Sequence, residues 1–218
     1  MSQPEETGVP DRATAGQFSS ARLEAFSDGV FAIAITLLVL DLAVPARHDL
    51  AGRSLARALG AEWPSYFAYL VSFGVIGIIW VNHHVLCALI KQADRVVLFA
   101  NLFLLLTVSV IPFPTRLLAE YLTARGDSHV AAAIYSASML AMSIAFTLLF
   151  LAICRDARLL HVPLDRDTVR RTLRSFSLGG VFYLATVGLS FISAVLTLIV
   201  HAVLAAYYCF DQLAPARS

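Results

Sequence analysis

An aspartate and two adjacent histidines could do chemistry within the apolar stretches of this sequence. Asp28 lies two residues into the apolar run Phe26 to Leu42, and His83 and His84 lie near the end of the run Tyr66 to Leu89. An ionisable group at membrane depth is costly unless a partner or water meets it, so such residues mark a functional or structural site. The chemistry open to them is a hydrogen-bonded network between helices or a path for protons.

The first apolar run also carries a stripe on one helix face, made of Ile33, Thr36, Leu37 and Leu40. These residues follow the i, i+3, i+4, i+7 spacing of a helix. One hydroxyl among branched apolar side chains could face a narrow pore, but threonine is also common where membrane helices pack together. On spacing alone packing is the commoner explanation, and both interpretations stay open.

Other chemistry has less support. The two histidines of the Trp-Val-Asn-His-His group point about 100° apart on one helix, which does not suit joint binding of one metal. Asp28 and Asp41 lie about 20 Å apart by helix rise and cannot act as one carboxylate pair. The sequence has no glycine-rich phosphate loop, no HExxH and no GxSxG. We therefore expect no enzyme, no cofactor and no bound metal. A membrane enzyme with an Asp/His site remains as an alternative, ranked below the two transport functions described at the end of this section.

Membrane helices must position these residues. Of the 218 residues 59% are hydrophobic and 14% are charged, with a mean hydropathy of +0.76. A soluble domain would need more surface charge, and a net charge of +1 gives no field to recruit nucleic acid. We expect an all-α integral membrane protein with six spans, at Phe26 to Leu42, Tyr66 to Leu89, Val96 to Leu118, Val130 to Cys154, Ser175 to Ser190 and Ala194 to Phe210.

The distribution of basic residues sets the expected topology. With the N-terminus inside, 11 of the 16 Lys and Arg residues fall on the cytoplasmic side, which favours cytoplasmic N- and C-termini. We expect a disordered cytoplasmic tail at residues 1–20, one membrane domain at residues 21–212, and a second cytoplasmic tail at residues 213–218.

Several segments outside the spans carry further predictions. Residues Leu50 to Leu59 could form a short amphipathic helix at the membrane interface. Pro112 and Pro114 should kink the end of the third span. Arg155 to Arg174 carries six Arg and three Asp, and we expect a cytoplasmic loop that is solvated or touches anionic lipid. The turn between the last two spans should fall near Ser190 to Ser193.

The start of the first span resembles a family signature. Residues Arg22 to Asp28 have the pattern RxxxFSD, and an AIxxTLLVL run follows. Together with the histidine cluster in the second span and the prolines in the third, this pattern is similar to the transmembrane protein 175 family, the endosomal and lysosomal potassium channels. Bacterial members of that family carry one six-helix repeat and assemble as tetramers.

The resemblance implies a potassium-selective or potassium-preferring leak channel in a bacterial inner membrane, with K⁺ as the permeant ion. The first helices of a homotetramer would line the pore. Ile33 would form the narrowest ring, Leu37 and Leu40 would follow it, and Thr36 would contribute to selectivity. This changes the interpretation of the stripe from packing to pore lining. The structural polar network would draw on Arg22, Phe26, Ser27, Asp28, Trp80, Asn82, His83 and His84, with either histidine as the partner.

The alternative is a proton-permeable channel or proton-coupled transporter. In it Asp28 would relay protons with His83 or His84, because intramembrane Asp/His pairs mark such paths. In either case the expected partners are copies of the chain and the lipid bilayer.

Overall fold

The computed structural model describes residues 18–42, 44–45, 52, 54–124 and 126–213 of the chain. Most of the predicted N-terminal tail, the end of the C-terminal tail and part of the Leu50 to Leu59 segment lie outside these residues. The described part is helical apart from a small two-stranded sheet, which confirms the predicted all-α class. Its helices are α1 (Ser20–Leu37), η1 (Leu38–Asp41), α2 (Leu55–Ala61), α3 (Trp63–Leu89), α4 (Arg95–Val110), α5 (Pro112–Tyr121), α6 (Asp127–Cys154), η3 (Ala157–Leu159), α7 (Arg166–Ser190) and α8 (Ala194–Leu213).

Four stretches of the described chain are long and apolar enough to cross a membrane: Ser20–Asp41, Trp63–Leu89, Arg95–Tyr121 and Asp127–Cys154. They correspond to the first four predicted spans. The first begins six residues earlier than predicted, because the polar residues before Phe26 continue the helix. The last two predicted spans lie in α7 and α8, and neither is among these four. Helix α8 contains a shorter apolar stretch over Ala194–Tyr208.

Proline divides the third stretch as predicted. Helix α4 ends at Val110, and α5 starts with Pro112 in its first turn. Proline lacks an N–H group and clashes with the preceding turn, so it starts a helix well and does not continue one. The short helix α2 begins at Leu55, where the Ser54 hydroxyl accepts a hydrogen bond from the Arg57 N–H.

The prediction of a loop over Arg155 to Arg174 is wrong for its second half. Helix α7 already begins at Arg166, capped by the Asp165 carboxylate, which accepts from the Thr168 N–H at 3.2 Å. Arginine is a good helix former, so the charged residues that precede the apolar run belong to the same helix. The predicted turn near Ser190 to Ser193 is confirmed, since α7 ends at Ser190 and α8 begins at Ala194.

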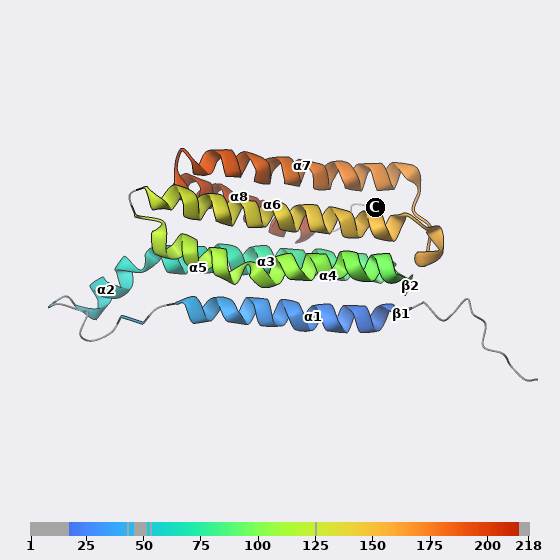
Figure 1. Cartoon of the computed structure of the whole chain (residues 1–218), viewed down its shortest axis with the longest axis horizontal. Helices are drawn as coiled ribbons and strands as arrows, with labels where there is room; N and C mark the ends of the chain where they lie inside the picture. Colours follow the sequence, from blue (N-terminus) through green and yellow to red (C-terminus); the bar gives the residue numbers. More distant parts are fainter. Residues whose placement is uncertain (1–17, 43, 46–51, 53, 125, 214–218) are drawn as a thin grey trace, which may run out of the picture.

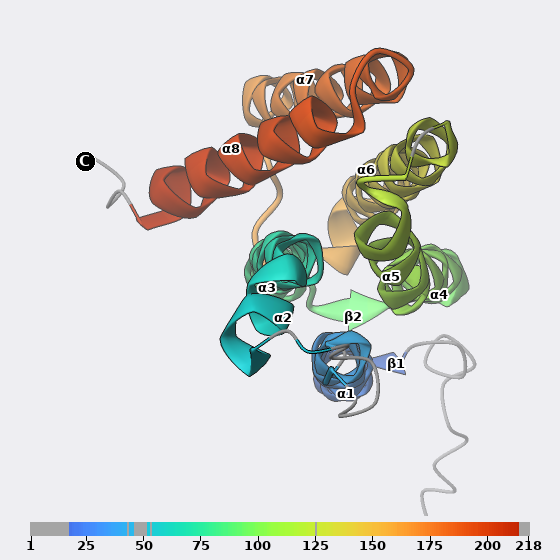
Figure 2. The same ribbon diagram turned by 90° about the vertical axis from the view of Figure 1, so that its left-hand side faces the viewer.

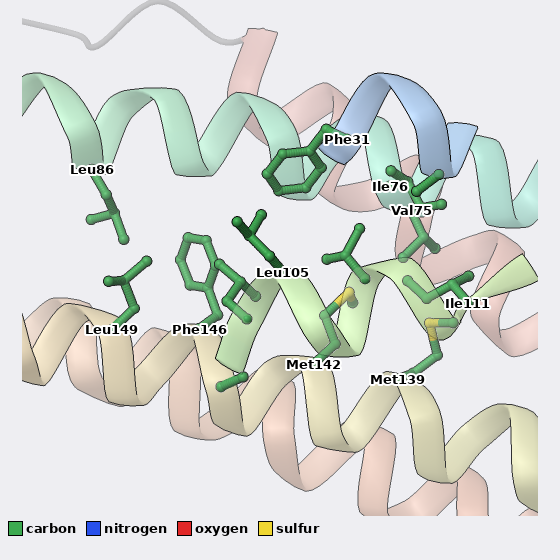
Figure 3. Close-up of a cluster of buried hydrophobic side chains, with 14 of the residues drawn as sticks. Phe31, Val75, Ile76, Leu86, Leu105, Ile111, Met139, Met142, Phe146 and Leu149 are labelled. Atoms are coloured by element: carbon green, nitrogen blue, oxygen red, sulfur yellow. The ribbon is translucent and has the colours of Figure 1, made fainter. Parts of the chain in front are cut away.

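The helices stack in layers, with α1 on one side of the bundle and α7 and α8 on the other (Figures 1 and 2). Helix α1 packs mainly on α3 and α4, whereas α6 packs on α4, α5 and α7. The buried side chains between α1, α3, α4 and α6 form the core (Figure 3). Phe31 of α1 reaches into it and is 1% exposed. One face of α1 is therefore held by the rest of the subunit.

A backbone clasp ties three segments together at one end of the bundle. Strand β1 (Phe18–Ser19) pairs antiparallel with β2 (Gln92–Ala93), so the end of the predicted disordered tail is ordered. On its other side the α3–α4 turn meets the segment after η3, where Ile90 forms a bridge with Leu160. The Lys91 N–H donates to the Leu159 carbonyl at 2.8 Å, and the His161 N–H donates to the Leu89 carbonyl at 3.0 Å. An ion pair between Arg155 and Asp94 lies beside these bonds.

Candidate functional site

Helix α1 has two distinct faces. Its buried residues are Leu23, Ser27, Phe31 and Ala34, with Leu38 continuing the face into η1. The predicted stripe lies on the other side: Ile33 is 61%, Leu37 42% and Leu40 74% exposed. An apolar stripe that the rest of the subunit leaves uncovered is not a packing seam within this subunit.

Thr36 lies on the exposed side of α1. Its hydroxyl donates to the carbonyls of Ala32 at 2.9 Å and Ile33 at 3.0 Å. A hydroxyl has one hydrogen and two acceptor lone pairs, so these bonds occupy the donor and leave the oxygen able to accept. The exposed side of the helix therefore presents one weak oxygen ligand among apolar side chains.

A buried hydrogen-bond chain crosses from α1 to α4 and then to α3. Asn101 donates from Nδ2 to the Ser27 hydroxyl at 3.0 Å, and Ser27 donates to the Leu23 carbonyl at 2.8 Å. His83 donates from Nε2 to Asn101 Oδ1 at 2.8 Å, because an amide oxygen can only accept. Ser27 and His83 are fully buried and Asn101 is 2% exposed. Buried polar groups need such partners, so this chain fixes how α1 sits on its neighbours.

A second, more exposed pair of contacts joins α1 to α3. The Trp80 indole Nε1 donates to Asp28 Oδ1 at 2.8 Å. His84 Nδ1 lies 2.7 Å from Glu24 Oε1. Both helices present these residues four apart, Glu24 with Asp28 and Trp80 with His84, so the two contacts form neighbouring rungs on facing helix sides.

The structure places the predicted network residues in separate groups, with the two histidines in different ones. His83 joins the buried chain that contains Ser27, whereas His84 lies at the surface and meets Glu24. Among the described residues, no hydrogen bond joins Asp28 to either histidine. Arg22 is exposed and Phe26 is 57% exposed, so both lie on the uncovered side of α1.

Asn82 occupies a different place. It lines a cavity between α3, α6, α7 and α8, on the side of α3 away from α1. Adjacent residues of a helix point about 100° apart, which explains why His83 and Asn82 face different neighbours. In the part of the chain that the structure describes, no group of three His, Cys, Asp or Glu residues could hold a metal ion.

Sequence reasoning missed two polar features of the subunit. It did not name Glu24 as a partner, although its four-residue spacing from Asp28 matches that of Trp80 and His84. It also missed a buried hydroxyl cluster between α3, α5 and α6. There the Ser72 hydroxyl lies 3.0 Å from the Tyr135 hydroxyl, and the Thr115 hydroxyl donates to Ser72 at 2.8 Å. Each of these hydroxyls is isolated in its own apolar run, so no sequence pattern indicates that the three side chains meet.

Comparison with known proteins gives a consistent result. The sequence model of the family described as "Endosomal/lysosomal potassium channel TMEM175" matches residues 22–112. The chain is 52% identical to a potassium channel of Streptomyces collinus over 193 residues, 88% of this chain and 93% of that protein. The crystal structure of a lysosomal potassium-selective channel TMEM175 homolog from Chamaesiphon minutus aligns with a TM-score of 0.79 and 41% identity, covering 88% of this chain and 97% of that one.

An animal relative matches a smaller part. The human protein named endosomal/lysosomal proton channel TMEM175 is 41% identical over 100 residues, which are 43% of this chain and 20% of that protein. Among the proteins similar to this chain, some are therefore named potassium channels and others proton channels.

Proposed function

The chain belongs to the TMEM175 family, and on that premise we propose that it is a potassium-preferring leak channel of a bacterial inner membrane. The family is one of ion channels, and its similar bacterial relatives are named potassium channels. In the proposed assembly four copies surround one axis, with α1 at the centre and six helices per subunit crossing the membrane. K⁺ is the permeant ion, and no cofactor is needed.

The observation that carries this proposal is the uncovered side of α1. Ile33, Leu37 and Leu40 are exposed on a helix whose opposite face is buried, and α1 lies at one side of the subunit (Figure 2). Four such helices around an axis would cover one another and turn the stripe inward. A ring of isoleucines has no polar group to replace the water of an ion, so it conducts when wide enough to stay wet and otherwise closes by dewetting.

Thr36 supports a preference among cations in this assembly. Its oxygen retains acceptor capacity on the exposed side of α1, between the levels of Ile33 and Leu40. Four copies would form a ring of weak oxygen ligands in an otherwise apolar pore. We propose that this ring favours K⁺, while Ile33 acts as the main gate and Leu37 and Leu40 act as further seals.

The contacts to α3 and α4 support a structural role for the motif residues. Ser27 binds Asn101, and Asp28 binds Trp80, so both hold α1 at a fixed rotation with the stripe facing outward from the subunit. This rotation matters because a turn of 100° would replace each stripe residue by its neighbour. Asp28 is thereby a structural residue in the proposed channel and not an ion ligand.

The charge distribution supports cytoplasmic termini. The start of α1, the α3–α4 turn and the start of α7 lie at the same end of the bundle (Figure 1). The basic residues of the described chain concentrate at this end, in Lys91, Arg95 and the Arg155 to Arg174 segment. Cytoplasmic ends attract such residues, and we propose that the segment lies against anionic lipid headgroups.

Reconstitution into liposomes tests the channel proposal. With a K⁺ gradient and a potential-sensitive dye, wild-type protein should produce a larger signal than with a Na⁺ gradient. Ile33→Trp should block this signal, because four indoles would fill the axis. Val203→Trp is the matched control, since Val203 is equally exposed at 61% but lies on α8, far from α1. Flux no greater than in empty liposomes, or equal loss in both variants, would refute the proposal.

Proton permeation is the second candidate, favoured by the name of the human relative and by the ionisable rung of Glu24 with His84. The proton path expected from the sequence, from Asp28 to His83 or His84, has to be replaced by one through Glu24 and His84. The reason is that Asp28 is bound to Trp80 and His83 is bound to Asn101. A pH-sensitive dye inside the same liposomes separates the two candidates. A proton flux that persists without K⁺ and disappears in His84→Gln would support this candidate.

A further inference from the structure

A cavity of about 120 Å³ lies between α3, α6, α7 and α8, away from α1. Its wall is mixed in character. Polar atoms come from Asn82, Ser143, Ser175, Tyr183 and Tyr208, and the remaining wall is formed by apolar side chains such as Val75, Ile79 and Phe176. For scale, an apolar cavity of about 150 Å³ accepts benzene, so this space holds a short chain segment and is far too small for a helix.

An apolar groove adjoins the cavity along the contact of α3 with α8. Ile78 and Ala205 line both the cavity and a hollow that also contains Leu70, Gly74 and Ala202. Leu70 and Phe67 in turn line a further hollow that reaches Trp63 and Val195. The three spaces share lining residues in sequence, so they lie in a row along the contact of α3 with α8, from the polar cavity to an aromatic end at Trp63. We call this row of neighbouring spaces the path.

Positive charge stands at the polar end of this path. Arg171 precedes Ser175 by four residues, so the two share a face of α7 and lie about 6 Å apart along it. The Arg171 guanidinium donates to the Thr168 hydroxyl at 3.3 Å, which leaves most of its five donors for other partners. The Asp165 carboxylate, six residues before Arg171, caps the helix through the Thr168 N–H and also attracts the Arg171 charge.

We propose that this path binds one anionic diacyl phospholipid of the cytoplasmic leaflet in each subunit. The phosphate meets Arg171, the ester groups meet the Ser143, Ser175 and Tyr183 hydroxyls of the cavity, and one acyl chain runs along the groove between α3 and α8. The proposal rests on the membrane orientation proposed above, in which the start of α7 is cytoplasmic.

The depths of the parts fit such a lipid. Asn82 lies seven residues before the end of α3 at Leu89, about 10 Å below that end by helix rise. Ester groups lie below the phosphate and above the hydrocarbon, and the cavity has the same order of charge, polar groups and apolar wall. A second copy of the chain would bring a helix, which the groove could receive but the polar cavity could not.

Gly179 provides a way to close the cavity. A Cβ atom at Gly179 would lie 3.2 Å from the Tyr208 hydroxyl, so a larger side chain enters the space that the lipid would use. Gly188 is the matched control on the same helix, because a Cβ atom there meets nothing within 4 Å.

Native mass spectrometry of the purified full chain tests the proposal, with phosphatidylglycerol and phosphatidylcholine added in equal amounts. Wild-type protein should retain phosphatidylglycerol in preference. Arg171→Gln should weaken that retention about fivefold, equivalent to the ~1 kcal/mol that one basic residue contributes at an anionic surface. Arg166→Gln removes the same charge from another side of α7 and should leave retention unchanged. Gly179→Leu should abolish retention, and Gly188→Leu should not.

Several results would overturn the proposal. Equal retention of both lipids by wild-type protein, or equal weakening by Arg166→Gln and Arg171→Gln, would leave a general surface attraction only. Undiminished retention in Gly179→Leu would exclude the cavity. Loss of the oligomer in Gly179→Leu with normal lipid retention in Arg171→Gln would show that another copy covers the groove. Lipid binding is measured without any K⁺ flux, so the two proposals can fail separately. A protein that binds the lipid but passes no K⁺ would refute the channel proposal and leave the lipid proposal standing.

Discussion

Asn101 links three helices, and its removal should destabilise the subunit more than loss of the nearby exposed contact. Asn101→Ala removes the bond to Ser27 and the bond to His83, both buried. Hydrogen bonds between membrane helices contribute about 0.6 kcal/mol each and at most about 1.7. The substitution also leaves the buried His83 Nε2–H without its partner, which costs about 1–3 kcal/mol. We expect a total loss of about 2–4 kcal/mol.

Trp80→Phe is the comparison. It removes only the indole N–H that binds Asp28, keeps an aromatic ring, and acts at a position that is 42% exposed. One exposed hydrogen bond contributes about 0.5–1.5 kcal/mol, so the loss should lie at the low end. The assay is the melting temperature of the detergent-solubilised protein, followed by loss of the intact oligomer in size-exclusion chromatography. At about 2–4 °C per kcal/mol, Asn101→Ala should lower it by about 5–15 °C and Trp80→Phe by a few degrees.

The order of the two effects is the decisive result. If Trp80→Phe lowers the melting temperature as much as Asn101→Ala, the rung between α1 and α3 is buried by neighbouring subunits and the reasoning from subunit exposure fails. If neither variant changes the melting temperature, the polar chain does not hold α1 in place. The folding of both variants can be checked by comparing their circular dichroism spectra at 20 °C with that of the wild-type protein.

Four further predictions concern the pore and helix α7. Ile33→Asn should raise the K⁺ leak per intact oligomer by hydrating the proposed constriction, and an unchanged leak would contradict the gate. Thr36→Val keeps the shape and removes the oxygen, so it should reduce the K⁺ over Na⁺ preference; an unchanged ratio in liposomes would contradict its role. Leu37→Cys should form disulfide-linked dimers under mild oxidation, seen as a doubled mass in a non-reducing gel, and failure to cross-link would argue against a central α1. Hydrogen bonds from Thr168 hold the pKa of the Asp165 carboxyl below its usual value, so the cap should contribute fully at neutral pH and be lost as the pH falls through that lowered pKa; Asp165→Asn should remove this acid dependence from the melting curve, and an unaltered acid limb would contradict it.

The sequence predicted features that follow from a single periodicity. The stripe on α1 could be read because one helix repeats every 3.6 residues, and the structure places Ile33 and Leu37 on its uncovered side. Leu40 is also exposed but lies in η1. The break at Pro112 followed from proline chemistry alone. Apolarity alone places the start of α7 too late, because Arg166 to Arg174 is polar and yet helical.

Other features depend on how two helices rotate against each other. His83 and His84 are equivalent in sequence, and only the packing of α3 turns one toward Asn101 and the other toward Glu24. Asn82 belongs to a different cavity for the same reason. The matching four-residue spacings on α1 and α3 were visible in the sequence, but nothing there shows that those two faces meet.

The clasp at the end of the bundle has a mechanical consequence for α1. In the described chain, the hydrogen bonds and ion pairs that join this segment to its neighbours lie between β1 and Asp28. Beyond Asp28 the helix is held by the packing of Phe31, Ala34 and Leu38. A rod that is pinned by polar contacts near one end and held only by packing beyond them tilts about the pinned end, so its displacement grows with distance from that pivot. Counted from Asp28, Ile33 lies about 8 Å and Leu40 about 18 Å along the rod, so a small tilt moves the outer position about twice as far. In the proposed pore, the outer ring would therefore widen first and the ring nearest the pivot would be the last to yield.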